Sequence, residues 1–208
     1  MPETPKGPRN TKAPKPLNVK EEEEEILKVV AGLVQTELLP SPSSKRVLET
    51  LPKCRIAHFE CHGISDSLNP SGSSLILQCH DKTGTTLEQD RLTVEQISDL
   101  QLDGAQIAYL SACSTAENKS EDLQEEVIHI VSGFQVAGFP HVIGCLWPAG
   151  DSECVEVAKN FYSILLKEKR SLDVEEDVAW ALQRAVDKVR REDLGMPLNW
   201  AQFVHFGA

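Results

Sequence analysis

Apolar runs of strand length alternate along this chain with longer segments in which apolar residues recur every three or four positions. Short apolar runs bounded by turn-forming residues are typical of buried strands, and the longer spacing is typical of amphipathic helices. The predicted strands are 54–60, 74–78, 105–112, 142–147 and 200–207. The predicted helices are 21–33, 45–51, 93–100, 123–137, 155–165 and 174–189.

This alternation predicts the fold class and the domain organisation. Strands separated by helices form a largely parallel sheet with helices on both faces, so we predict an α/β fold. Thr93 and Gln96 form a capping box, which marks the start of one of the helices. Residues 1–20 carry five prolines and are expected to be a disordered lead-in, followed by one domain over 21–208.

Composition and charge narrow the class of protein. The 208 residues carry a formal net charge of −11, which argues against a nucleic-acid partner because phosphate contacts require clusters of Lys and Arg. The six cysteines include no CxxC pair, and no apolar run approaches the length of a membrane span. We therefore expect a cytoplasmic protein with reduced cysteines and no contact with membranes.

Two segments place reactive side chains where predicted strands end. His62 follows the run Ala57–Glu60 closely, and Cys113 follows the run 105–112. Ligands of open α/β folds bind beyond the carboxyl ends of parallel strands, and a His that activates a Cys is the minimal set for thiol catalysis. The alternative is that Cys113 is a small buried hydrophobic residue, which is the commoner role of a cytosolic cysteine.

Four motifs in this order resemble the CHAT domain, a caspase- and separase-like peptidase domain often found after tetratricopeptide repeats. They are HFECHG at 58–63, YLSACSTAE at 109–117, AGFPHVIGCLWPAGD at 137–151 and NWAQFVHFG at 199–207. The resemblance covers roughly residues 20–208, and the helix after Cys113 is most similar to fungal members. It implies a caspase-like sandwich and a cysteine endopeptidase with His62 and Cys113 as the catalytic pair.

The chain departs from the family pattern at three places. Glu60 stands where the family usually has a small residue, and Cys145 replaces a Thr or similar residue before Leu-Trp-Pro. The amino-terminal strand of longer members is missing or replaced by the proline-rich lead-in. The first two departures leave the expected chemistry intact, whereas the third bears on whether the domain folds by itself.

The resemblance also implies roles for residues beside the dyad. The backbone N–H groups of Gly63 and Cys113 would form the oxyanion hole that stabilises the tetrahedral intermediate. Asp151 matches an acidic residue that binds a basic P1 side chain in separase-like members, and it also stands where a helix N-cap is expected. Trp147 is expected to be a packing anchor or a wall of the substrate pocket.

A metal site is not expected from the sequence. His58, Glu60 and His62 alternate and would share one face of a strand, with His80 on the next strand. Ligands two apart on a strand rarely complete a tetrahedral shell, and the helical HExxH spacing is missing. The dyad requires neither metal nor other cofactor, so none is predicted.

Together these features predict a cysteine endopeptidase that cleaves a protein or peptide partner after a basic residue. The segments 65–73 and 114–122 are the expected mobile loops, and low basal activity is expected until a regulatory repeat domain or an upstream activator orders them. The alternative is a catalytically silent CHAT-fold interaction or signalling module in a repeat-containing protein. Retention of both His62 and Cys113 argues against that alternative.

Overall fold

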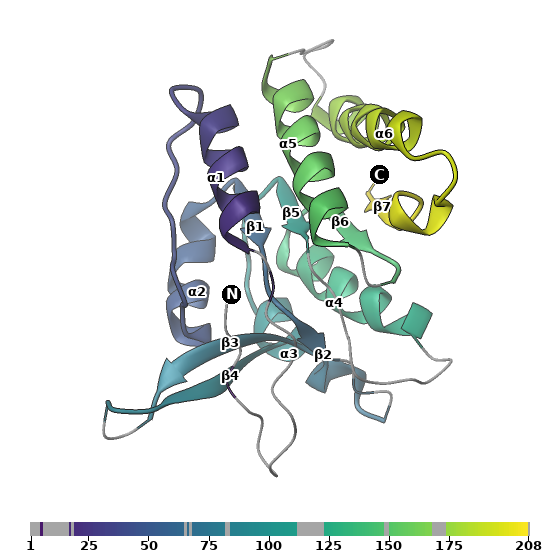
Figure 1. Ribbon diagram of the computed structural model, residues 1–208. Helices are drawn as coiled ribbons and strands as arrows, with labels where there is room; N and C mark the ends of the chain where they lie inside the picture. Colours follow the sequence, from purple (N-terminus) through teal and green to yellow (C-terminus); the bar gives the residue numbers. More distant parts are fainter. Residues whose placement is uncertain are drawn as a thin grey trace.

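The fold is seen in a computed structural model (Figure 1). It describes residues 5, 17, 19–64, 66, 68–81, 84–111, 123–147, 150–167 and 174–207, without the side chains of 123–129 and 174–176. Cys113 and the segment 114–122 lie outside the described residues, as does most of the predicted lead-in. The first helix begins at Val19, so the last two residues assigned to that lead-in are helical.

A four-stranded sheet forms the centre of the molecule. Its strands, in spatial order, are β1 (Ile56–Phe59), β5 (Ile107–Leu110), β6 (His141–Cys145) and β7 (Phe203–Phe206). The first three are parallel, and β7 pairs antiparallel with β6 at the edge. The central strands β5 and β6 are buried along their whole length, as expected for a sheet covered on both faces.

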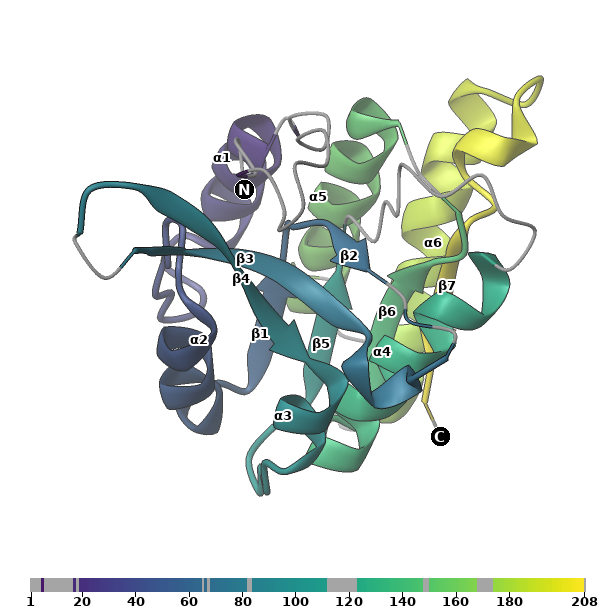
Figure 2. The ribbon, with the colours of Figure 1, turned by 90° about the horizontal axis from the view of Figure 1, so that it is seen from below.

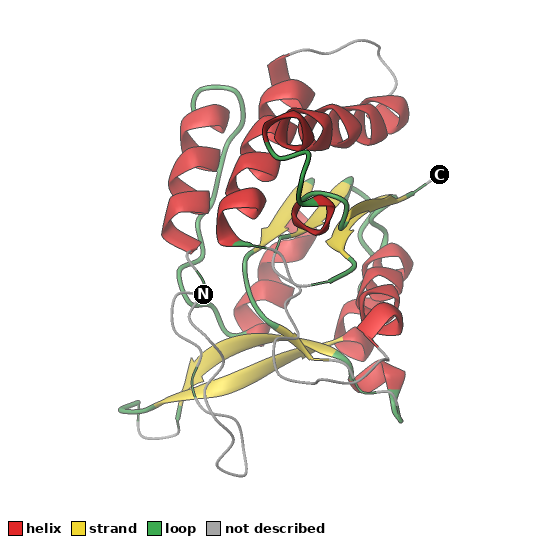
Figure 3. Ribbon diagram, turned by 45° about the vertical axis from the view of Figure 1, so that its right-hand side comes forward, coloured by secondary structure: helices red, strands yellow, loops and turns green. Residues whose placement is uncertain are grey.

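Helices cover both faces of this sheet, which confirms the predicted α/β fold class (Figures 1 and 3). One layer contains α1 (Val19–Val30), α5 (Asp151–Lys167) and α6 (Val174–Glu192), and the other contains α2 (Ser44–Thr50), α3 (Val94–Ser98) and α4 (Leu123–Ala137). Strand β5 shows why two cores form. Ile107 and Tyr109 pack with α1, α5 and α6, whereas Ala108 and Leu110 pack with α2, α3 and α4, because successive side chains of a strand point to opposite faces.

A second, antiparallel sheet lies beside the α2, α3 and α4 layer (Figure 2). It consists of β2 (Gly63–Ile64), β3 (Ser74–His80) and β4 (Leu87–Thr93), in that order. The predicted strand 74–78 is therefore confirmed, but it belongs to this separate sheet. Strand β4 was not predicted because its sequence, LEQDRLT, is mostly polar and only Leu92 is buried.

Local signals located most element boundaries well. The capping box at Thr93 is confirmed, since its side chain accepts from the N–H of Gln96 and the Gln96 side chain accepts from the N–H of Thr93. Proline is the first or second residue of each of the three short 3-10 helices that the structure describes, at Leu51–Lys53, Pro70–Gly72 and Pro197–Asn199. The helix predicted over 21–33 begins and ends two to three residues earlier, at Val19–Val30.

Candidate active site

Strands β1 and β5 bring the two predicted catalytic segments to one edge of the sheet. The strands are adjacent and parallel, with Phe59 opposite Leu110, and the ladder continues where the N–H of Ser111 donates to the carbonyl of Phe59 at 3.0 Å. His62 follows Phe59 by three residues in sequence, and Cys113 follows Leu110 by three. The described chain after β5 stops at Ser111, so the role of Cys113 stays a prediction.

His62 is held inside the protein where the chain passes from the first sheet to the second. Its exposed fraction is 2%, and its carbonyl accepts from the N–H of Ile76 on β3 at 2.7 Å. Gly63 begins β2 opposite Leu75 and has no left-handed φ, so glycine is not required there by a sharp turn. A Cβ at Gly63 would lie 3.4 Å from Cδ1 of Ile130, an ordinary contact.

The two predicted substrate-binding residues lie after β6. Trp147 is half-buried, and its indole N–H donates to the carbonyl of Leu198 at 2.7 Å, which joins it to the carboxyl-terminal segment. Asp151 is exposed and begins α5. The carbonyl of Gly150 accepts from the N–H of Cys154 at 3.2 Å, so Gly150 occupies the N-cap position rather than Asp151. The structure therefore leaves the Asp151 carboxylate exposed in the first turn of the helix.

Ser111, two residues before the predicted nucleophile, bonds to side chains from three other elements. Its side chain is fully buried, and Oγ donates to the carboxylate of Glu22 on α1. Its carbonyl accepts from two thiols, those of Cys145 on β6 at 3.6 Å and Cys154 on α5 at 3.5 Å. The backbone that leads to Cys113 is thus fixed by side chains from both neighbouring helices and the next strand.

Three of the thiols that the structure describes are poor candidates for the nucleophile. Burial raises the pKa of Cys61, the thiol beside His62, to about 12. Desolvation also raises the pKa of Cys54 and of Cys79. Because the thiolate is the reactive form of cysteine, these three thiols are expected to be less reactive than an ordinary cysteine at neutral pH.

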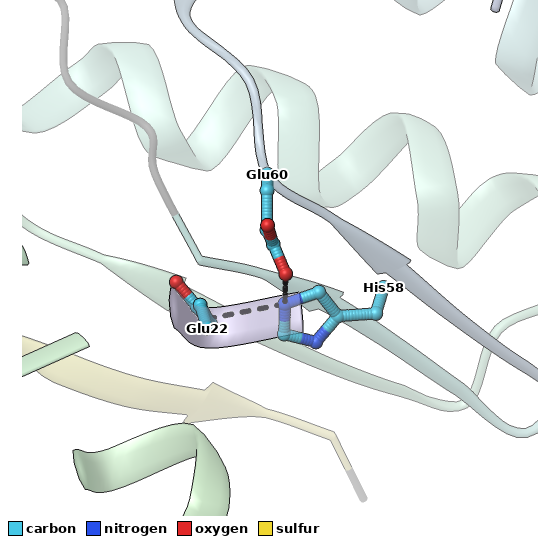
Figure 4. Close-up of side chains that lie close together, drawn as sticks. All are labelled: Glu22, His58 and Glu60. Carbon is cyan, nitrogen blue, oxygen red and sulfur yellow. Dashed lines mark ion pairs between the residues drawn. The ribbon is translucent and has the colours of Figure 1, made fainter. Parts of the chain in front are cut away.

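A buried ionisable cluster lies beside the site and was missed from sequence (Figure 4). His58 Nε2 lies 3.2 Å from Glu22 Oε1 and 3.4 Å from Glu60 Oε1, and His58 Nδ1 lies 3.0 Å from the Tyr162 hydroxyl. Burial alone would lower the pKa of His58, but Tyr162 and the two carboxylates outweigh it and hold that pKa well above 6.5.

A signal for this cluster was present in the sequence. Glu22 lies three residues after Val19 and four before Ile26, on the face of α1 that packs against the sheet. Acidic residues are favourable at the amino-terminal end of any helix, so the run at 21–25 does not by itself single out Glu22. The structure groups Glu22 with His58 and Glu60, whereas His62, predicted to share their face, is not part of this group and directly precedes β2.

Comparison with known families places this geometry in context. Residues 5–208 match the CHAT domain family, whose members are related to the caspase-like cysteine peptidases. No curated protein matches the chain. Among the residues that the structure describes, no helix is long and apolar enough to cross a lipid bilayer.

Proposed function

This chain belongs to the CHAT domain family, and we propose on that basis that it is a cysteine endopeptidase with His62 and Cys113 as its dyad. The observation that carries the proposal is the parallel pairing of β1 with β5, which starts both catalytic segments from the same sheet edge. That edge is where α/β folds bind their ligands.

In the proposed mechanism His62 removes the thiol proton of Cys113, and the thiolate attacks the scissile carbonyl. The backbone N–H groups of Gly63 and Cys113 donate to the oxyanion as the tetrahedral intermediate forms. His62 then returns the proton to the leaving amine, and a water molecule activated by the same imidazole hydrolyses the thioester. Burial of His62 supports this role, because proton transfer is favoured where competing water is excluded.

The proposed substrate is a protein or peptide with Arg or Lys at P1. Asp151 and Glu153 place two carboxylates in the first turn of α5, and Asp151 is exposed, so it is accessible to a basic side chain of a substrate. The net charge of −11 also favours a basic partner. The proposal also places the protein in the cytoplasm. There a regulatory repeat domain or an upstream activator orders the site.

Covalent labelling tests the dyad. The protein is treated with a peptidyl acyloxymethyl ketone that carries Arg at P1, and the adduct is located by mass spectrometry. We expect a single adduct on Cys113, at least tenfold slower in His62→Ala, with Cys61 unlabelled because its thiol is buried and protonated. Cys113→Ser is the negative control, and His80→Ala is the control for loss of a histidine elsewhere.

Three results would overturn the proposal or part of it. Labelling of several cysteines at a rate that His62→Ala does not change would exclude the dyad and favour a silent interaction module. A probe with Asp at P1 that reacts faster than the Arg probe would exclude the basic pocket, as would an Arg probe that reacts equally with Asp151→Asn. Slow labelling that accelerates when a binding partner is added would support regulation of the same dyad.

A further inference from the structure

The buried cluster of Glu22, His58 and Glu60 has the composition and spacing of a metal site. Glu22 comes from α1, His58 from β1 and Glu60 from the residue after β1, and their ligand atoms all lie within 4.8 Å of one another. The side chains are 7%, 15% and 15% exposed respectively. Among the described residues, no other group of three His, Cys, Asp or Glu residues meets this spacing.

The distances within the cluster match those between ligands of a tetrahedral ion. Bonds of about 2.0–2.1 Å from zinc to nitrogen or oxygen place neighbouring ligand atoms about 3.3–3.4 Å apart. Nε2 of His58 lies 3.2 Å and 3.4 Å from the two carboxylate oxygens. Figure 4 shows both carboxylates approaching this one ring nitrogen, from different directions.

The same nitrogen lies close to both carboxylates but makes no well-aligned hydrogen bond. Nε2 of His58 is shielded from solvent, yet neither carboxylate meets hydrogen-bond geometry with it. A proton on Nε2 would be expected to align with one of two acceptors so near, because an unpaired buried donor is costly. A cation placed between the three atoms satisfies all of them at once, and it neutralises two buried carboxylates that a single proton neutralises only by half.

Outer contacts already hold the ligands in place. Nδ1 of His58 is fixed by the hydroxyl of Tyr162 at 3.0 Å, and the ring stacks on Tyr109 with centroids 4.7 Å apart. The hydroxyl of Ser111 donates to Glu22. Such second contacts on the far nitrogen of a histidine and on a ligating carboxylate are a regular feature of metal sites.

We propose that Glu22, His58 and Glu60 bind one divalent transition-metal ion, of which Zn²⁺ is the best match. An imidazole with two carboxylates suits Zn²⁺ better than Mg²⁺ or Ca²⁺, which prefer shells made of oxygen alone. Three protein ligands leave one tetrahedral position for water. The ion links α1 to the central sheet and uses neither His62 nor Cys113. It therefore leaves the metal-free dyad mechanism unchanged. The sequence argued against a metal because ligands two apart on a strand rarely complete a tetrahedral shell. In the structure the third ligand of the group is Glu22 of α1 rather than His62.

Zinc binding to the full chain tests the proposal. Protein stripped with a chelator is titrated with Zn²⁺ in competition with a chromogenic chelator, in a Cys113→Ser background that removes the predicted reactive thiol. We expect one ion per chain and a rise in the unfolding temperature of about 5–10 °C at a hundredfold excess over the dissociation constant. Co²⁺ is expected to give the visible absorption of a tetrahedral site without a thiolate charge-transfer band.

Isosteric variants assign the ligands. Glu60→Gln and Glu22→Gln are each expected to weaken Zn²⁺ binding at least tenfold, with the metal-free unfolding temperature checked separately. His205→Gln is the control, because Nδ1 of His141 and Nε2 of His205 lie 3.0 Å apart and form a separate histidine pair that could attract zinc. The proposal is overturned if Zn²⁺ binding is unchanged in both Glu60→Gln and Glu22→Gln, or if it is lost in His205→Gln. It is also overturned if the chain does not bind Zn²⁺ at one ion per molecule.

Discussion

The hydrogen bond between Ser111 and Glu22 is expected to be a major attachment of α1 to the sheet. Ser111→Ala removes a fully buried hydroxyl that donates to a carboxylate, itself only 7% exposed. Hydrogen bonds to charged groups contribute about 1.5–3 kcal/mol, and the carboxylate left behind cannot turn to water. We therefore expect Ser111→Ala to lower the free energy of unfolding by about 2 kcal/mol, which corresponds to about 4–8 °C in a domain of this size.

The chain provides a matched control for this substitution. Ser74 on β3 is 1% exposed, and its Oγ makes no hydrogen bond among the described residues. Ser74→Ala removes the same atom from an equally buried position, so it is expected to change stability by no more than about 0.5 kcal/mol. The comparison separates the value of the bond to Glu22 from the general cost of removing a buried hydroxyl.

Urea unfolding with chelator present measures both variants without any contribution from bound metal. A double-mutant cycle of Ser111→Ala with Glu22→Gln is expected to give a coupling energy of about 1–2 kcal/mol, because the two side chains touch. Equal losses in Ser111→Ala and Ser74→Ala, or a coupling energy near zero, would refute the reasoning and leave α1 attached through its apolar face alone.

Two further predictions concern backbone strain and pH. Gly138 has φ of 118°, and a Cβ there would lie 2.6 Å from the carbonyl oxygen of Leu102, so Gly138→Ala is expected to lower the free energy of unfolding by about 2–4 kcal/mol. Urea unfolding measures this loss. Gly104→Ala is the control, because a Cβ at Gly104 would have nothing within 4 Å, and equal losses in the two variants would contradict the steric argument. Burial and the neighbouring His141 lower the pKa of His205 in the folded protein. The unfolded chain therefore protonates His205 more readily than the folded protein does, and the free energy of unfolding should fall as the pH drops through and below about 6.5. His205→Gln should reduce this fall, measured as unfolding temperature at about pH 7.5 and 5.5; an unchanged pH dependence would exclude His205 as its source.

Much of the main sheet and its helices could be predicted from the sequence. Strands β5 and β6 are continuous apolar runs, and α5 and α6 follow the helical period, because burial on both faces or on one face imposes those patterns directly. The capping box at Thr93 is similarly local. Strand β4 escaped prediction because it is held by pairing with β3 rather than by burial of its own side chains.

Part of the candidate site could likewise be predicted from the sequence, and part could not. Motifs at His62 and Cys113 located the predicted dyad, since each stands just beyond an apolar run and the family resemblance names both. The supporting residues are different. Ser111 and Glu22 are 89 residues apart in sequence, and His58 and Tyr162 are 104 apart. No periodicity within one segment can relate such pairs.

By itself, then, the sequence determined the strands of the main sheet, strand β3 and the helices, together with the CHAT family and the two residues of the proposed dyad. Periodic burial and short motifs are local properties, and they can be recognised without knowing what packs against them. Only the tertiary structure separated β2, β3 and β4 into their own sheet and turned Glu22 inward onto His58 and Ser111. Those outcomes depend on strand register and on how α1 docks against the sheet. Both are set by contacts between residues far apart in the chain.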